Sequence, residues 1–436
     1  MGVLRPGALV LLTVGLGLGS ATAHANPASV VPTIGDGPNA LLRVDYEYEV
    51  DTSNIDREHV GDPGADPLAP LTRQHDLVFH QYKHTVTPRL DVGVYHDTWL
   101  SVALPIIVTQ ARELRLGSGV DRSESPSVLS GYIPESGFDA HDPLTPPPGD
   151  LLFRGGERHG LNQLHVGIGV APMNQRRDDT KPTWKLGVEG RFAVGKIMRF
   201  DRLDPSGETG VSEGVHELRL WTTVDRKLGW VEPWFEASWQ VPIALRSGSL
   251  YQDPGFGSTN AMPGQLATAK FGVEIFVVDD KETRNKISLD LSTRIVGHFE
   301  GRGYSEMWEV FAFAGDQRID GNPLVLDANP LDTGLQALSH PGITNIENYL
   351  ETAAHLTLAA DLGRVRFALN ADIMWKTDHA ITFADGGIDR NNNGIVDAGT
   401  NEVNPVYAAP IDLVGHRYLS DGNLGVAIGI EGQFLF

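Results

Sequence analysis

Apolar and polar residues alternate with a period of two along most of the chain. From Leu42 to Val50, apolar or aromatic side chains occupy the even positions and charged side chains occupy the odd ones. The same alternation recurs from Lys286 to Glu300 and from Arg364 to Lys376. Because successive side chains of a strand point to opposite faces, each run predicts a long β-strand with one apolar and one polar face.

Strand length separates two kinds of β-protein. Strands of soluble proteins usually have about five or six residues, whereas a strand that crosses an outer membrane has about nine to eleven. A large soluble β-sandwich also alternates, but it does not account for such lengths over most of a chain. Twelve segments show the pattern, with approximate limits 40–51, 73–95, 98–113, 159–174, 183–198, 214–226, 230–246, 266–278, 286–301, 348–361, 364–383 and 422–436.

The connections between these segments alternate between short and long. The short ones are 96–97, 176–182, 227–229, 279–285 and 362–363, and the long ones lie near 52–72, 114–158, 199–213, 247–265, 302–347 and 384–421. Short periplasmic turns and long extracellular loops characterise outer-membrane barrels. The sequence therefore predicts an all-β fold, a transmembrane antiparallel up-and-down β-barrel of about 12 strands over residues 40–436.

The chain ends on "GVAIGIEGQFLF", an apolar stripe that runs to the last residue. This tail resembles the C-terminal signature of Gram-negative outer-membrane β-barrel proteins, in which Phe434 and Phe436 would hold the two aromatic positions. Gly432 departs from that pattern. The resemblance implies a location in the outer membrane, contact with its lipid, and recognition of Phe434 and Phe436 by the barrel-assembly machinery. A narrower porin or transport family is not resolved.

The first 25 residues have the features of a secretory signal. Arg5 precedes a short apolar run from Gly7 to Leu18, and Ala23 to Ala25 supply small residues for cleavage after Ala25. The apolar run is too short to span a membrane as a helix. We expect residues 26–39 to form a short periplasmic segment before the barrel.

Composition narrows the function further. The 436 residues include no cysteine, which excludes disulfides, thiolate metal sites and thiol nucleophiles. The formal charge is −21, and removal of the signal with Arg5 makes it −22. A strongly acidic protein is a poor partner for nucleic acid.

The polar face of the predicted strands carries both positive and negative side chains. A dry interior would make these charges costly, so they require either a hydrated lumen or a dense network of ion pairs. The lumen-lining residues expected on this face include Arg43, Asp45, Glu47, Glu189, Arg191, Glu274, Asp290, Arg294, Arg366 and Asp372.

Two functions fit this interior, and a third is less favoured. The first is a passive channel or transporter for small solutes, with at most a slight cation preference because both signs are present. The alternative is a non-conducting structural or adhesive barrel with a filled lumen. A hydrolase is disfavoured because the chain contains no H-E-x-x-H motif, and the Ser339–His340 and His141–Asp142 pairs lie in loops without a recognisable catalytic constellation. Residues 304–315 are expected to form a short helix, either over the lumen or on the surface.

One loop has the spacing of a calcium-binding loop. "DRNNNGIVD", from Asp389 to Asp397, resembles the D-x-[DN]-x-[DN]-G loops of EF-hand and dockerin repeats. The twelfth position is Thr400 where those loops have Glu, and Glu402 would substitute for it. The ligands expected for a structural Ca²⁺ are Asp389, Asn391, Asn393, the Ile395 carbonyl, Asp397 and Glu402.

Overall fold

The computed structural model describes residues 39–59, 72–251, 262–280, 282–283, 285–327, 333–334, 336–397, 399–404 and 406–436. The predicted signal peptide 1–25 lies outside these residues. So does the predicted periplasmic segment 26–39, except for Asn39.

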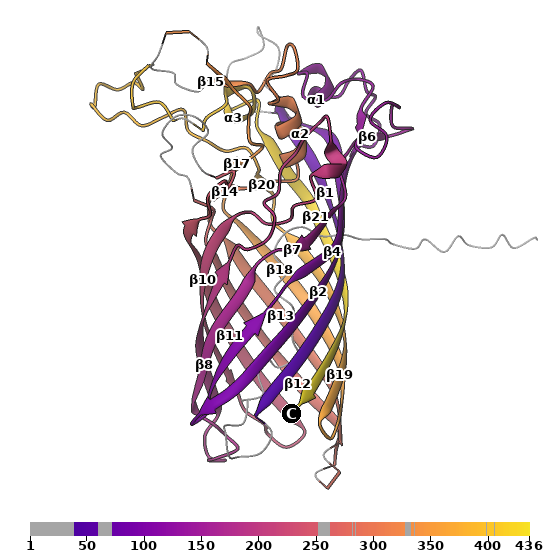
Figure 1. Cartoon of the computed structure of the whole chain (residues 1–436), viewed down its shortest axis with the longest axis vertical. Helices are drawn as coiled ribbons and strands as arrows, with labels where there is room; N and C mark the ends of the chain where they lie inside the picture. The colour runs from indigo at the N-terminus through magenta and orange to yellow at the C-terminus, as the bar shows by residue number, and fades with distance from the viewer. Residues whose placement is uncertain are drawn as a thin grey trace, which may run out of the picture.

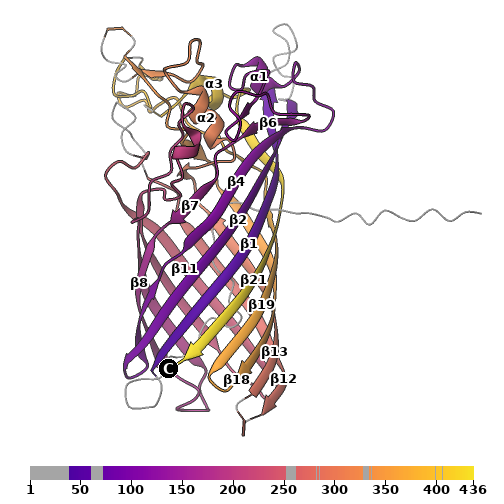
Figure 2. The same ribbon diagram turned by 45° about the vertical axis from the view of Figure 1, so that its right-hand side comes forward.

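Twelve antiparallel strands form a closed ring (Figures 1 and 2). Pairing of the last strand with the first, from Leu41 opposite Leu435 to Arg57 opposite Tyr418, closes the barrel. The ring consists, in order, of β1 (Ala40–His59), β2 (Thr72–Tyr95), β3 (Thr98–Ala103) continued by β4 (Ile106–Leu116), β8 (Leu164–Met173), β9 (Thr183–Phe192), β10 (Val215–Asp225), β11 (Val231–Leu245), β12 (Leu266–Asp280), β13 (Asn285–His298), β18 (Tyr349–Leu362), β19 (Val365–Lys376) and β21 (Tyr418–Leu435).

The remaining described elements belong to the long connections, most of them at the end of the barrel opposite the C-terminus (Figure 1). They are β5 (Phe138–Asp139), β6 (Leu151–Arg154), β7 (Arg158–Leu161), β14 (Gly301–Gly303), β15 (Leu326–Asp327), β16 (Ala337–Leu338), β17 (Thr344–Ile346), β20 (His379–Ala380), α1 (Pro126–Leu129), α2 (Trp308–Ala314), α3 (Ala409–Asp412) and the 3-10 helix η1 (Pro205–Gly207). Within the described ranges, no helix is long and apolar enough to cross a membrane.

The predicted architecture is confirmed, with differences at the strand ends. β1 continues to His59, into a stretch expected to be loop, because Arg57 and its neighbours pair with both β2 and β21. Two predicted strands are interrupted. The third breaks at Leu104–Pro105, where proline offers no N–H to the ladder, and the fourth breaks between β7 and β8. β19 ends at Lys376, seven residues before the predicted limit of 383.

The two faces of the barrel differ as the alternation predicts. On the outer face, Leu291, Phe367 and Ile430 are each more than half exposed. Their neighbours of opposite parity, such as Asp290, are polar and buried. An apolar belt around a closed barrel matches the hydrocarbon layer of a bilayer, where a closed ring leaves no backbone edge unpaired. The chain is thus an outer-membrane β-barrel, and its short turns mark the periplasmic end.

The extracellular end is covered by a compact apolar core. Met307, Val310 and Phe311 of the α2 region are completely buried there. They pack with side chains from the upper ends of the strands, including Ile55, Leu77, Phe79, Leu114 and Tyr418. We call this assembly of loops around α2 the cap. The cap gives the long loops a fixed position over the barrel mouth.

Because neighbouring residues of a strand face lipid and lumen in turn, substitutions at adjacent positions should affect barrel assembly to different extents. Leu291→Arg places a charge on the lipid-facing surface, which costs about 2–4 kcal/mol near the bilayer midplane. Asp290→Asn changes a buried lumen residue without adding charge to the lipid face. We expect Leu291→Arg to impair barrel assembly much more than Asp290→Asn, measured as the folded fraction in lipid bilayers. Equal folded fractions would contradict the assignment of the faces.

Candidate channel lumen

In the structure, all ten residues that the sequence led us to expect in the lumen lie at inward-facing positions of the strands. Seven of them, Arg43, Asp45, Glu189, Glu274, Asp290, Arg294 and Asp372, are less than a tenth exposed. The other three, Glu47, Arg191 and Arg366, are partly exposed. The inner face is therefore charged along much of its length, and most of these charged side chains are buried.

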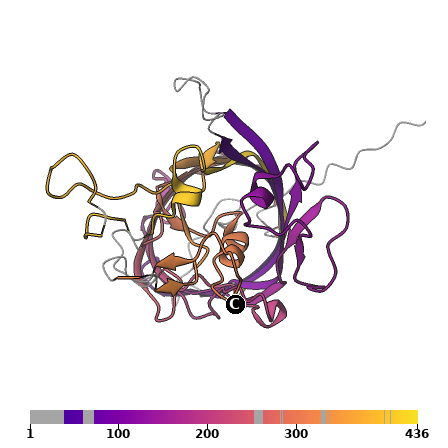
Figure 3. The same cartoon turned by 90° about the horizontal axis from the view of Figure 1, so that it is seen from above.

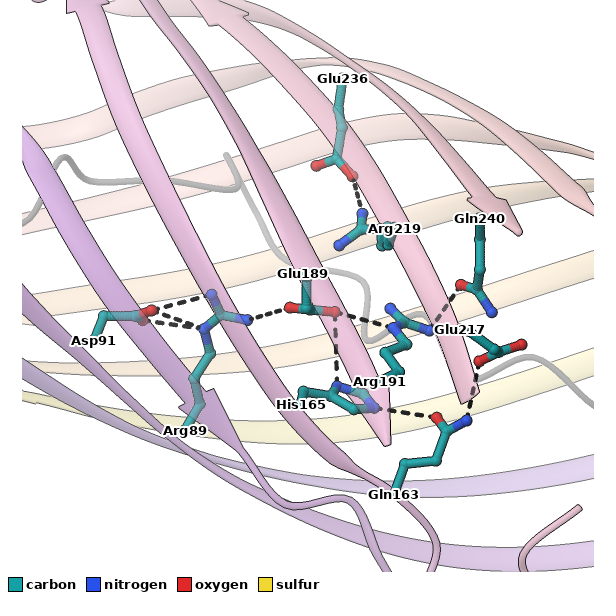
Figure 4. Close-up of polar contacts among 10 residues, drawn as sticks. All are labelled: Arg89, Asp91, Gln163, His165, Glu189, Arg191, Glu217, Arg219, Glu236 and Gln240. Atoms are coloured by element: carbon teal, nitrogen blue, oxygen red, sulfur yellow. Dashed lines mark hydrogen bonds and ion pairs between the residues drawn. The ribbon is translucent and has the colours of Figure 1, made fainter. Parts of the chain in front are cut away.

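Glu189 on β9 is the centre of a group of ion pairs on one side of the lumen (Figure 4). Its carboxylate lies 2.9 Å from Nε of Arg191 and 3.4 Å from a guanidinium nitrogen of Arg89. Nδ1 of His165 lies 3.7 Å from the same carboxylate. Arg89 is also held by Asp91, at 3.0 Å. Because β3 and β8 separate β2 from β9 in the ring, the Arg89–Glu189 pair joins non-adjacent strands.

Neighbouring residues extend this group along the wall (Figure 4). Arg191 donates a hydrogen bond to Oε1 of Gln240 on β11 at 2.8 Å. Arg219 on β10 forms an ion pair with Glu236 on β11 at 2.7 Å. We refer to the residues of Figure 4 as the Glu189 cluster. Each of its three arginines, Arg89, Arg191 and Arg219, has a carboxylate partner, so the cluster has no surplus positive charge.

Ion pairs on the other side of the lumen also join strands that are not neighbours. Lys376 on β19 lies 3.5 Å from Asp51 on β1, with β21 between them. Arg366 on β19 lies 3.7 Å from Glu274 on β12, across β13 and β18. Such contacts link strands that are not neighbours in the ring across the interior of the barrel.

A hydrogen-bonded chain on β18 and β19 resembles the parts of a hydrolytic site. Asp372 lies 2.9 Å from Nδ1 of His355, whose Nε2 lies 2.7 Å from the Thr357 hydroxyl. The same hydroxyl lies 2.7 Å from Oδ1 of Asn370. The chain therefore links polar side chains of β18 and β19 on the lumen wall.

Some buried polar atoms of the inner face have no protein partner. Within the described part of the chain, these include Nε of Arg43, Oδ1 of Asp290 and the hydroxyls of Ser53, Thr85 and Thr223. A buried polar group without a hydrogen bond costs about 1–3 kcal/mol. Ordered water at these positions would remove that cost.

Polar contacts fix the cap over the lumen. Seen from above, α2 lies inside the outline of the barrel (Figure 3). Glu309 of α2 forms an ion pair with Arg158 of β7 at 2.7 Å, and both side chains are almost completely buried. Arg112 of β4 donates a hydrogen bond to the Ser305 carbonyl at 2.7 Å. The short helix expected within 304–315 is confirmed, and it lies over the lumen.

The sequence did not reveal which charges pair. His165, Gln163 and Glu309 have roles in the lumen or cap that alternation alone could not assign. Arg158 and Glu309 are 151 positions apart, and neither belongs to a long alternating run. Only the strand register and the path of the loops bring such residues together.

The structure brings the residues of the predicted calcium loop together through hydrogen bonds. The Asp389 carboxylate accepts from the backbone N–H groups of Asn393 and Gly394, at 3.1 and 2.7 Å. The side-chain amides of Asn391 and Asn393 both donate to Oδ2 of Asp397.

Glu402, the residue expected to replace the missing twelfth-position ligand, lies in the same loop. Its two oxygens accept hydrogen bonds from the backbone N–H groups of Arg390, Asn391 and Asp397. In this conformation Glu402 orders the loop and has no oxygen directed away from it.

The C-terminal aromatic residues lie on the outer face of β21. Phe434 and Phe436 are partly exposed, and their ring centroids are 4.6 Å apart. The N–H of Phe436 donates to the Ala40 carbonyl at 2.8 Å, which continues the seam that closes the ring. Recognition of this tail by the assembly machinery stays a prediction.

Comparisons with known proteins find only distant structural likenesses. No family model and no curated protein matches the chain. Among solved structures, the COG4313 outer membrane channel from Pseudomonas putida F1 is 10% identical, with a TM-score of 0.41, over 92% of this chain and 98% of that one. A Pseudomonas aeruginosa FadL homologue is 7% identical, with a TM-score of 0.31, over 94% and 96% of the two chains. The TodX monoaromatic hydrocarbon channel is 9% identical, with a TM-score of 0.32, over 94% and 93%.

The cap contains a carboxyl group that makes its order sensitive to pH. Asp412 lies at the end of α3, and burial raises the pKa of its carboxyl group to about 7. A 2.7 Å hydrogen bond from the Ala408 N–H acts in the opposite direction, but its effect on the pKa is smaller than that of burial. The folded cap favours the protonated form, so this stabilisation is present at acid pH and is lost as pH rises toward 7. We expect limited proteolysis to cleave the cap faster at pH 8 than at pH 5.5.

The matched variant is Asp412→Asn, which keeps the shape of the side chain and removes its titration. Its cleavage should change much less between the two pH values, once the protease rate on an unfolded peptide is used as the reference. An equal pH effect in both proteins would assign the behaviour to other groups.

Proposed function

We propose that the protein is a passive outer-membrane channel for small solutes. The observation that carries this proposal is the inner face, where buried polar atoms such as Oδ1 of Asp290 and Oγ1 of Thr85 have no partner in the described chain. A lumen with such a lining needs water, and a water-filled path through the barrel admits small polar solutes. The ion pairs that join non-adjacent strands favour a narrow path.

A non-conducting structural or adhesive barrel is the second candidate. The ion pairs Lys376–Asp51 and Arg366–Glu274, together with the cap, favour it because they fill the interior and cover its mouth. The two candidates differ in one measurable property. A channel gives discrete conductance steps in a planar bilayer and admits small solutes into proteoliposomes, whereas a filled barrel does neither.

A substitution in the cap tests whether the cap limits conduction through the proposed channel. Glu309→Gln leaves Arg158 buried without its carboxylate partner, and breaking a buried ion pair in this way costs about 3–5 kcal/mol. We expect the variant to loosen α2 and to raise the mean single-channel conductance or the open fraction several-fold in a planar bilayer.

Asp320→Asn is the matched control, because Asp320 is exposed on the loop that follows α2. It should conduct as the wild type does. The cap would have no part in limiting conduction if Glu309→Gln and Asp320→Asn both gave wild-type steps. Silent bilayers for all three proteins, together with proteoliposomes closed to small solutes, would favour the filled barrel.

We also propose that the 389–402 loop takes up a structural Ca²⁺. The convergence of Asp389, Asn391, Asn393 and Asp397 supports the proposal, since their oxygens and the Ile395 carbonyl are ligands that calcium prefers. Binding would require Glu402 to release backbone N–H groups if it is to serve as a ligand. The role of the ion would be to order an extracellular loop.

Calcium should protect this loop from protease in the wild-type protein. Asp389→Ala combined with Asp397→Ala removes two ligand charges, so we expect the double variant to lose that protection. The measurement is the cleavage rate between 384 and 409 with calcium or with a chelator. Cleavage of the wild type at the same rate in both conditions would eliminate the site.

A further inference from the structure

A row of oxygen-bearing side chains follows the inner face across half of the barrel. The strand register places Asp290 opposite Thr357, Thr357 opposite Asn370, and Asn370 opposite Gly429. It continues with Gly429 opposite Glu47 and Glu47 opposite Thr85. We call these six positions the oxygen row. It contains no lysine, arginine or histidine, and Gly429 leaves its middle without a side chain.

Three basic residues near the oxygen row form ion pairs with carboxylates outside it, and His355, which contacts Thr357, pairs with Asp372. Arg294 lies 2.8 Å from Glu351, and Lys83 lies 2.6 Å from Glu49. Arg366 is shared among acidic residues outside the row, Asp361, Glu274 and Glu431.

The two carboxylates of the row therefore lack a close cation. Among the described residues, no lysine or arginine nitrogen lies within 4.0 Å of the Glu47 or Asp290 carboxylate. When ionised, these two carboxylates have no lysine or arginine partner in the part of the chain that the structure describes.

Two atoms of the row also lack hydrogen-bond partners in the part of the chain that the structure describes. Trp234 donates to Oδ2 of Asp290 at 2.6 Å, which leaves Oδ1 of the same carboxylate unpaired. The Thr85 hydroxyl at the other end of the row is likewise unpaired. Asp290 and Thr85 are only 1% and 4% exposed, so neither atom is satisfied by bulk solvent. Both ends of the row present oxygen atoms suited to a cation.

We propose that the oxygen row binds a small monovalent inorganic cation in passage and gives the channel a preference for cations. The inference rests on the proposed channel function and assigns the selectivity to these positions. A cation beside either carboxylate compensates the charge of that group, and the neighbouring hydroxyl and amide oxygens of the row replace part of its hydration shell. The oxygen row is spread over six strands, which suits a weakly held, exchanging ion better than a tightly bound divalent one.

The test measures reversal potentials in a planar bilayer under a potassium chloride gradient. We expect the wild type to reverse toward the potassium equilibrium potential. Glu47→Gln combined with Asp290→Asn should lower the potassium-to-chloride permeability ratio at least three-fold. Asn370→Asp adds a carboxylate to the row and should raise the ratio, which gives a second variant of opposite sign.

The matched control is Asp179→Asn with Glu282→Gln, which removes the same charge from exposed residues of the periplasmic turns. It should keep the wild-type permeability ratio. Conducting variants of the row with an unchanged ratio would overturn the inference and leave the channel proposal intact.

A binding measurement separates the two proposals if no protein conducts. We expect detergent-solubilised wild-type protein to broaden the ²³Na NMR line more than the Glu47→Gln, Asp290→Asn variant at equal concentration. Equal line widths would overturn the inference without reference to conductance, whereas absence of conductance with a line-width difference would overturn only the channel.

Discussion

The cost of placing charges inside a narrow barrel is the constraint on which this structure depends. Buried ionised groups are tolerated only when they are paired, hydrogen-bonded or hydrated. The Glu189 cluster satisfies most of its charges by ion pairs across several strands. The oxygen row has no such partners for Glu47 and Asp290 among the described residues, and we propose that water and a mobile cation take that role.

The outer face and the cap follow from this interior. An apolar belt with Leu291 and Phe367 lets the barrel lie in lipid, because all charges are directed inward or to the ends. The cap brings apolar side chains over a polar lumen, and it depends on the buried Arg158–Glu309 pair for its position. In the channel that we propose, the cap is the first part of the protein that a solute from outside meets.

The sequence predicted the barrel because strand alternation is a local signal that repeats at each crossing. It predicted the inward direction of Asp290 and Arg294 for the same reason. It could not predict the pairing of Arg89 with Glu189 or Lys376 with Asp51, since those contacts depend on strand register and on the radius of the closed ring. The break at Pro105 was within reach of sequence reasoning, because proline cannot donate to the ladder. The position of α2 was not, since it follows from loop packing.

Water access to the inner face is the property that most directly tests the account. The chain has no native cysteine, so single cysteines report one position each. Thr357→Cys places a thiol on the inner face and Leu358→Cys places one on the lipid-facing side of the same strand. A hydrated lumen predicts that a small, charged, membrane-impermeant thiol reagent labels position 357 in lipid vesicles much faster than position 358. Protection of both positions, in a barrel shown to be folded, would contradict a water-filled lumen.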